Sequence, residues 1–583
     1  MNSIGVRQPK TDEVDSTDRA SLTPLRPLTA TDSTPPAPDD SQQRAAHDRA
    51  PRQRPTLSQL KKRLSESGWS VPLCWMIPAF LLRLFLVCGF EQVISPDGVQ
   101  YVSLGRALMA GNFRAGLSPY WPPLYPLLTG LSSLVFHDPE FAGRFVSVVA
   151  GSLLVIPCYR LMRNWHGERA AVVGASLIAL HPLLIYYSTV LLTESTYTLL
   201  FTCGVLAGWT ALSSGRSRAF LLAGLTLGAC YLLKPEAAGF LLLLLVPTLC
   251  RKLFDKSSSF KTCARNALLL CAGFLLLATP YVLYLRAQTG AWTLSGKMAA
   301  HLWQGSRLAG GELAPTLNPL LPGMTTVVVQ LTKALRFEHE IFSLIFPPTF
   351  VLLAALGLFR KRWTKGRARR ELYLFSFVAA TLLGYSVTLP NIRFIVPLLP
   401  ILLCWSAKGV VEFAEWANET LAGAGGASRL LLPLRKIIAP LIIAGLLASL
   451  LPLSVYLLRG DKWSDYYGQK RAAAWIKEQD AASAPVIMST VPIAAFYAKG
   501  RHVELVDEEY ATLIARARRE GVRYLIVNER DFRYLSLRPL LDGNIIHPGL
   551  SLVHAIGEAP GHAILVYAVD EQRPGATQKV ESP

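Results

Sequence analysis

Long apolar runs of about 20 residues recur along most of this chain. A helix of about 20 residues rises about 30 Å, which is the thickness of the hydrocarbon layer of a membrane. Hydrophobic residues make up 51% of the chain and charged residues only 17%, so a soluble multidomain protein is excluded. The sequence predicts a polytopic α-helical membrane protein with about 11 spans. The expected spans are 72–93, 142–162, 169–189, 196–212, 219–234, 236–250, 266–285, 341–359, 371–389, 394–410 and 437–458.

The positive charges predict the orientation of these spans. The loop 360–370 holds seven Lys and Arg in eleven residues, and the loop 251–265 holds five in fifteen. The longer loop 286–340 holds only five in 55. Short loops rich in Lys and Arg stay in the cytoplasm. We therefore expect a cytoplasmic N-terminus, and we attribute the net charge of +19 to membrane topology rather than to a nucleic-acid partner.

One apolar run does not fit this alternation. Counting 119–136 ("PYWPPLYPLLTGLSSLVF") as a span would invert every later basic loop, and three prolines crowd its start. We expect this run to form a helix in the outer membrane interface instead.

Composition divides the chain into four parts. Residues 1–68 are rich in Pro, Ser, Thr, Asp and Arg, which predicts a disordered cytoplasmic tail. A transmembrane domain covers 69–458 and includes an outer loop at 94–141. In 459–570, short β-branched segments ("PVIMST", "HVELVD" and "VRYLIVNE") alternate with helical ones, which predicts a small extracytoplasmic α/β domain. The last part, 571–583, is expected to be a loose tail.

Several charged residues lie where the spans meet the outer boundary. Asp97 directly follows the first span and could accept a proton from a hydroxyl nucleophile, although Asp is also a favoured helix N-cap. Glu194 lies in a very short outer turn, where a carboxylate near hydrocarbon needs a partner, although it could cap a helix together with Thr193. Lys234 and Glu236 share the next outer turn, and a surface ion pair would explain both equally well.

Cations near the outer face suggest a site for phosphate. Arg83 lies near the middle of the first span and Arg393 at the outer end of a later one, and guanidinium groups hold phosphate oxygens in a bidentate fork. Each cation alone is explained by anchoring at the interface. Together with the carboxylates they suit a phosphate-bearing lipid and a hydroxyl acceptor.

No nucleotide or metal motif accompanies these residues. The sequence has no Walker loop, no GxGxxG, no HExxH and no metal-spaced histidine cluster. We expect that no cofactor is required; a divalent metal is not indicated, although carboxylates could bind one.

The order of several short motifs resembles the GT-C fold glycosyltransferases, and more narrowly the bacterial branch with the protein O-mannosyltransferases and the lipid A aminoarabinose transferases. The matching segments are "PDGVQYVSLGRALMAG", "WPPLYPLLTGLSSLVF", "FAGRFVSVVAGSLLVIPCYRL", "LHPLLIYYSTVLLTES", "LLKPEAAGFLLLL" and "IRFIVPLLPIL".

The resemblance implies a sugar transferase of the bacterial inner membrane. The donor would be a polyprenyl-phosphate sugar, and a lipid, glycan or protein would accept the sugar on the outer side with inversion at the anomeric carbon. Asp97 matches the catalytic acidic residue and would be the general base. Glu194 matches a substrate-binding position, and Lys234 and Arg393 match basic residues that face the carrier phosphate.

The candidate substrate-binding set also includes Tyr101, Glu236 and Arg83. Many relatives carry a second acidic residue where this chain has Gly98, which disfavours a protein acceptor. A transporter or lipid flippase is the alternative function, and a catalytically silent scaffold with an outer binding domain is a third. Membrane lipids surround the protein in each case, and acceptor recognition is one hypothesis for the C-terminal domain.

Overall fold

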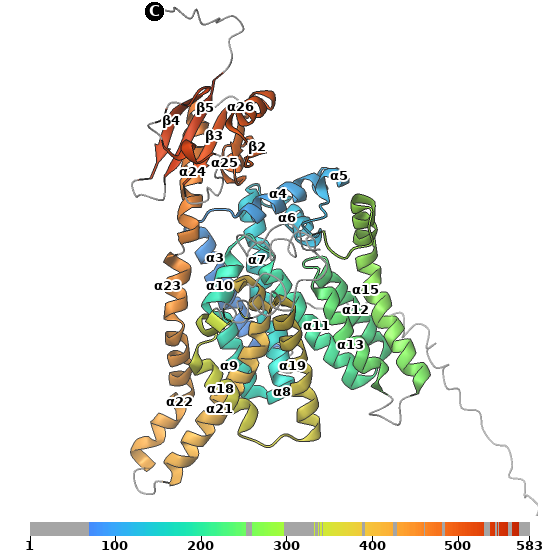
Figure 1. The fold of residues 1–583 in the computed structure, drawn as a ribbon. Helices are drawn as coiled ribbons and strands as arrows, with labels where there is room; N and C mark the ends of the chain where they lie inside the picture. Colours follow the sequence, from blue (N-terminus) through green and yellow to red (C-terminus); the bar gives the residue numbers. More distant parts are fainter. Residues whose placement is uncertain are drawn as a thin grey trace, which may run out of the picture. The chain divides into compact units, whose positions relative to one another are not determined.

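A computed structural model of the chain describes residues 69–251, 259–296, 342–386, 391–423, 428–459, 461–480, 484–529, 537–542, 547–557 and 563–570, with a few single positions between them (Figure 1). The expected tails at 1–68 and 571–583 lie outside the described residues.

Helices occupy every apolar run that the sequence singled out. Six of them, within the described residues, are long and apolar enough to cross a membrane, or seven if a bent pair counts as one span. The polytopic helical fold is therefore confirmed, whereas the count of eleven spans remains a prediction. The helical elements that lie in or beside the expected spans, whether or not each is long enough to cross a membrane, are α3 (Ser70–Gly89), α7 (Pro139–Leu153), α8 (Val155–His166), α9 (Glu168–Leu180), α10 (Pro182–Thr189), α11 (Glu194–Ser214), α12 (Ser217–Tyr231), α13 (Ala237–Leu249), α15 (Phe260–Thr289), α18 (Pro348–Phe359), α19 (Lys365–Ser386), α20 (Ile392–Ile395), the 3₁₀ turn η1 (Val396–Leu398), α21 (Leu399–Gly423), α22 (Ser428–Ser449) and α23 (Leu451–Arg459).

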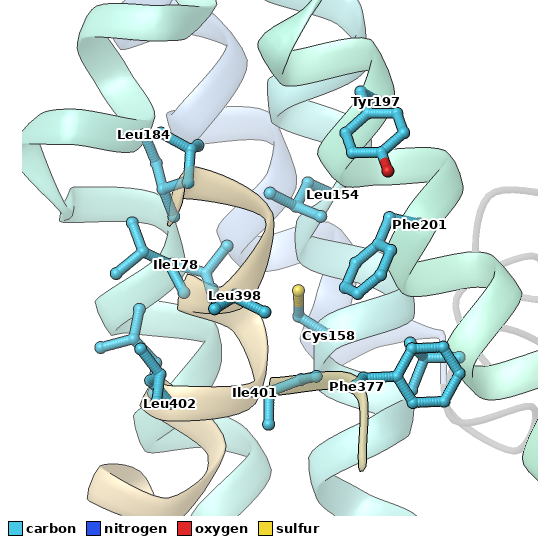
Figure 2. Close-up of a cluster of buried hydrophobic side chains, with 14 of the residues drawn as sticks. Leu154, Cys158, Ile178, Leu184, Tyr197, Phe201, Phe377, Leu398, Ile401 and Leu402 are labelled. Atoms are coloured by element: carbon cyan, nitrogen blue, oxygen red, sulfur yellow. The ribbon is translucent and has the colours of Figure 1, made fainter. Parts of the chain in front are cut away.

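The centre of the bundle is a tightly packed apolar core. Figure 2 shows side chains from several helices meeting there, with Leu398 and Ile401 facing Cys158 and Phe201. Large apolar side chains also cover the outside of the bundle; Leu81, Leu276 and Leu352 are 58%, 67% and 70% exposed. Such a surface is unfavourable in water but suits contact with lipid chains.

A buried arginine stabilises the break between α9 and α10. The two helices are bent by 50° at Pro182, which has no N–H to offer the carbonyl group of Ile178. The Arg83 guanidinium donates to this carbonyl at 3.5 Å and to that of Ala179 at 3.1 Å. Arg83 is completely buried. It therefore satisfies backbone carbonyls that the break leaves without a helical partner.

Three short helices follow α3: α4 (Pro96–Met109), α5 (Phe113–Gly116) and α6 (Leu124–Ser133). The ten residues of α6 rise only about 15 Å, too little to cross a membrane, in keeping with the interfacial helix expected for this run. Helices α4 and α6 touch at Gly105 and Gly130, where a Cβ on Gly105 would lie 2.6 Å from the carbonyl oxygen of Pro126. Only glycine permits this approach.

The segment after α23 contains a five-stranded mixed sheet, so the predicted combination of strands and helices after the last span is confirmed (Figure 1). The strands run in the order β2-β1-β3-β5-β4; β1 pairs in parallel with β2 and β3, and β5 pairs antiparallel with β3 and β4. The sequence predicted β1, β2 and β3 and missed the hairpin of β4 and β5. The elements are α24 (Asp461–Gln479), β1 (Val486–Ser489), α25 (Ile493–Tyr497), β2 (Arg501–Glu504), α26 (Tyr510–Arg519), β3 (Tyr524–Asn528), the 3₁₀ turn η2 (Arg538–Leu541), β4 (Leu550–Ile556) and β5 (Ile564–Val569).

Candidate active site

A cavity of about 580 Å³ lies among α4, α11, α13, α19 and α20. Much of its wall is apolar, with Phe201, Leu233 and Phe240 among the lining residues. Its charged and phenolic lining residues are Asp97, Lys234, Glu236, Arg393, Tyr101, Tyr120, Tyr197 and Tyr385. An apolar pocket with a few converging polar groups is the usual form of a small-molecule site.

Asp97 occupies the second position of α4 but does not cap it. The cap is Ser95, whose hydroxyl accepts from the N–H of Gly98 at 3.0 Å. The Asp97 carboxylate instead accepts from the Arg393 guanidinium at 3.0 Å and from the indole N–H of Trp121 at 3.4 Å. Because Ser95 takes the capping role, the Asp97 side chain is available to the cavity.

Gly98, the residue after Asp97, leaves no space for a side chain. A Cβ at this position would be 2.8 Å from Cγ1 of Ile94 and 3.2 Å from the carbonyl oxygen of Leu191. A carboxylate next to Asp97 would therefore displace the segment that precedes α4.

Glu194 lies behind the cavity wall rather than in it. Its side chain is 1% exposed, and Oε1 lies 3.3 Å from Nζ of Lys234 and 3.5 Å from Nε of Arg393. Its N-terminal neighbour Thr193 makes no capping hydrogen bond to α11. A buried carboxylate needs such cationic partners, so Glu194 orients both cations that line the cavity.

The turn between α12 and α13 does not contain the surface ion pair that its sequence allowed. Lys234 pairs with Glu194, whereas Glu236 accepts a hydrogen bond from the hydroxyl of Tyr385 at 2.6 Å. The Lys234 ammonium also lies over the rings of Tyr197 and Phe394, at 5.3 and 5.2 Å from their centroids. Lys234 is thus held at the cavity wall by one anion and two aromatic faces.

Tyr101 is 4% exposed and follows Asp97 by one turn of α4. Burial, together with the nearby Asp97 and Glu194 carboxylates, raises the pKa of its phenol well above the usual value. Tyr101 therefore stays neutral and can donate a hydrogen bond at any physiological pH.

Arg83 does not join this group. It lies at the break between α9 and α10 and is not among the residues that line the cavity. The structure thus brings together six of the seven residues singled out from the sequence: Asp97, Tyr101, Lys234, Glu236 and Arg393 at the wall, and Glu194 behind it.

No group of three or more His, Cys, Asp or Glu side chains in the described residues is arranged to hold a metal ion. The absence of a metal or cofactor requirement remains a prediction.

Comparison with known proteins gives the fold a family context. Residues 121–300 match the model of the dolichyl-phosphate-mannose-protein mannosyltransferase family. An undecaprenyl phosphate-alpha-4-amino-4-deoxy-L-arabinose arabinosyl transferase of Proteus mirabilis is 25% identical over 402 residues, covering 59% of this chain and 69% of the relative. The enzyme of that type from Pseudomonas aeruginosa is 27% identical over 176 residues, and the match spans only 30% of its length.

Two solved structures share the architecture. ArnT from Cupriavidus metallidurans, bound to undecaprenyl phosphate, superposes with a TM-score of 0.55 at 16% identity, over 86% of this chain and 98% of ArnT. The oligosaccharyltransferase of Archaeoglobus fulgidus gives a TM-score of 0.51 at 14% identity, over 79% of this chain and 70% of its own. The chain has the GT-C fold, and part of its sequence resembles glycosyltransferases of that type. None of the relatives named here is a transporter or flippase, so that alternative has no support.

The family match covers only part of the cavity. Glu194, Lys234 and Glu236 lie inside residues 121–300, whereas Asp97 and Arg393 lie outside them. The two residues that meet at 3.0 Å are therefore brought together by the fold and not by the matched segment.

The aromatic side of the cavity was missed from the sequence. Tyr120, Tyr197, Tyr385 and Phe394 all line it. Tyr197 follows Glu194 by three residues and so shares its helix face, which is a signal that the sequence offered. Tyr385 gave no such signal, because it reaches Glu236 across 149 residues.

Proposed function

We propose that this chain transfers a sugar from a polyprenyl-phosphate donor to a hydroxyl group of a lipid, glycan or protein, on the outer side of the bacterial inner membrane, with Asp97 as general base. The observation that carries the proposal is that one cation at the cavity wall, Arg393, forms ion pairs with two carboxylates, Asp97 at the wall and Glu194 behind it.

The cavity supports the donor class. The donor has a phosphodiester that carries charge and a long apolar tail, and the cavity offers Lys234 and Arg393 beside an apolar wall. Arg393 can hold phosphate oxygens with the same guanidinium that now holds Asp97. Binding of the phosphate would draw Arg393 from Asp97 and leave a better proton acceptor.

The chemical step needs no further activation. The acceptor oxygen would form a bond to the anomeric carbon while the bond from that carbon to the phosphate oxygen breaks. The proton of the acceptor hydroxyl would pass to Asp97. The negative charge that develops on the released polyprenyl phosphate would be stabilised by Lys234 and Arg393. Attack opposite the leaving group would invert the configuration.

The relatives help to choose the substrates. Two of them are named as aminoarabinosyl transferases that use undecaprenyl phosphate, which favours a pentose over a hexose as the transferred sugar. The lack of space for a second carboxylate at Gly98 favours a lipid or glycan acceptor over a protein.

The proposed orientation places α4 and the C-terminal sheet outside the cytoplasm. Figure 1 shows the connection between α18 and α19 at the end of the bundle opposite α4. That connection belongs to the basic stretch 360–370, which the distribution of charge assigns to the cytoplasm. Labelling of single cysteines placed in α5 and in this connection with a membrane-impermeant reagent would test the orientation.

The reaction can be tested with purified protein in liposomes, a panel of polyprenyl-phosphate sugars and a crude lipid and glycan extract. Release of polyprenyl phosphate is compared for the unmodified chain, Asp97→Asn and the control Asp138→Asn. Asp138 caps α7, and Asn caps helices equally well, so the control should be active. The proposal is supported if the unmodified chain and Asp138→Asn release polyprenyl phosphate while a folded Asp97→Asn does not. Equal release by Asp97→Asn rejects Asp97 as the base, and no release by the unmodified chain from any donor contradicts the donor class.

A further inference from the structure

The loop between α3 and α4 leads directly to Asp97. Residues 90–95 form neither helix nor strand, and Val93 and Ile94 are 6% and 1% exposed. The last residue of the loop is Ser95, which caps α4 two positions before Asp97. Any shift of this loop would therefore move the carboxylate of Asp97 directly.

Side chains from beyond the last span hold this loop. The hydroxyl of Tyr467, on α24, donates to the carbonyl oxygen of Glu91 at 2.6 Å. The ammonium of Lys470, one turn later, lies 2.7 Å from the Glu91 carboxylate. Tyr497, at the end of α25, accepts the backbone N–H of Ile94 at 2.9 Å. These contacts, 376 to 403 residues apart in the sequence, anchor both ends of the loop.

Tyr497 also reaches the first turn of α7. Its hydroxyl donates to Oε2 of Glu140 at 2.9 Å, and Glu140 in turn pairs with Arg144. One hydroxyl thus accepts from the loop and donates to α7. Burial and the Glu140 carboxylate raise the pKa of Tyr497, so the phenol stays protonated and keeps both hydrogen bonds.

We propose that Tyr497 is a positioning residue for the transfer reaction, because its hydroxyl fixes the Ile94 backbone against α7 and thereby sets the direction in which Asp97 enters the cavity. This inference rests on the proposed role of Asp97. It gives the C-terminal segment a role other than acceptor recognition: the segment holds the loop that precedes Asp97 in position.

Tyr497→Phe tests this idea, since it removes only the oxygen. The matched control is Tyr510→Phe, because the Tyr510 hydroxyl donates to the Pro548 carbonyl group within the C-terminal segment and does not touch the loop. We expect Tyr497→Phe to lower kcat for transfer roughly five- to tenfold, as expected for loss of a buried hydrogen bond that aligns a catalytic group. The donor KM should stay within twofold, about the scatter of such measurements.

Hydrogen exchange provides a readout that does not depend on activity. In the full chain, the peptide that contains the Ile94 amide should exchange faster in Tyr497→Phe than in Tyr510→Phe. Faster exchange together with a lower kcat at constant donor KM supports the inference. Unchanged exchange, or a kcat equal to that of the control, overturns it while the proposed function stands.

Two further results separate the remaining cases. If the unmodified chain releases no polyprenyl phosphate, the proposed function fails, and the inference fails with it because no reaction remains to be positioned. If Tyr497→Phe does not fold, Lys470→Met replaces it, since this lysine holds the same loop through the exposed Glu91 side chain. Faster exchange and lower kcat in Lys470→Met support the inference, and unchanged values overturn it.

Discussion

Arg83 and Ala179 lie on different helices, yet the guanidinium of the first donates to the carbonyl oxygen of the second at 3.1 Å. The same guanidinium reaches the carbonyl groups of Ala79 and Ile178 at 3.1 and 3.5 Å. A charged residue in the middle of a membrane helix is usually taken as functional. Here Arg83 donates to backbone carbonyl groups at the break before Pro182, and it does not line the cavity.

Replacing this arginine should affect stability and not substrate binding. Arg83→Leu leaves buried carbonyl groups without a donor, so we expect the free energy of unfolding to fall by about 2–3 kcal/mol. The donor KM should not change. Denaturant titration in detergent and steady-state kinetics measure the two effects. The control is Arg218→Met on the exposed face of α12, with an expected effect within about 0.5 kcal/mol. A raised donor KM at unchanged stability would restore Arg83 as a binding residue.

Arg393 should not tolerate replacement by lysine. It uses Nη1 for Asp97 and Nε for Glu194, and a single ammonium cannot reproduce that fork. We expect Arg393→Lys to lower kcat/KM about 10- to 100-fold, the equivalent of one charge-assisted hydrogen bond. Arg286→Lys, at the exposed end of α15, serves as the control. Full activity of Arg393→Lys would mean that the simultaneous pairing of Arg393 with Asp97 and Glu194 is not used in the reaction.

The contact between α4 and α6 should be sensitive to a single methyl group. In Gly105→Ala the new Cβ would lie 2.6 Å from the Pro126 carbonyl oxygen and 3.0 Å from the Gly130 nitrogen, so the helices must separate. Because α4 carries Asp97, we expect kcat to fall roughly 10- to 100-fold, as small displacements of a catalytic group do. Gly445→Ala, on α22, meets nothing within 4 Å and should have unaltered kinetics. Equal kinetics for both variants would show that α4 can shift without consequence.

The C-terminal sheet should lose stability in mild acid. His502 on β2 donates to the carbonyl oxygen of Ser489, and burial lowers its pKa below the ordinary value of 6.5. The unfolded state therefore binds a proton at a higher pH than the folded state. Stability is complete above about pH 6.5 and declines as the pH falls from there towards the folded-state pKa.

Hydrogen exchange of β1 and β2 at pH 7.5 and 5.5, corrected for intrinsic rates, would measure this dependence. His502→Asn keeps a donor for Ser489 but cannot titrate, so its stability should be less sensitive to pH. An identical pH dependence in both proteins would assign the effect to another group.

The apolar helices were predictable, because hydropathy over about 20 residues reports the free energy of transferring one helix into a membrane, which depends little on the rest of the fold. Asp97 and Arg393 were predictable as candidate site residues for a related reason, because a charged residue directly beside an apolar run is easily recognised in the sequence. Their contact was not predictable, because it depends on how helices about 300 positions apart pack.

Other features carried no local signal. Every residue of β4 from Ser551 to Val553 is exposed, so the strand lacks the alternation that marks a half-buried strand. Tyr497 reads as an ordinary helix residue, and only the fold brings its hydroxyl to Ile94. Arg83 was predicted to bind substrate but does not line the cavity. The sequence around it gives no sign of the Ile178 carbonyl group, which lacks a helical donor because of Pro182 and which Arg83 contacts instead.

The separation of 296 residues between Asp97 and Arg393 has a consequence for biosynthesis. At about 5–20 residues per second, a ribosome completes the arginine roughly 15–60 s after the aspartate. Glu194 meets Lys234 after only 40 residues, about 2–8 s later. The more deeply buried carboxylate, Glu194, can therefore be neutralised early, whereas the pair of Asp97 and Arg393 can form only when most of the protein has been synthesised. A chain that stalls before this point would lack the Arg393 partner of Asp97.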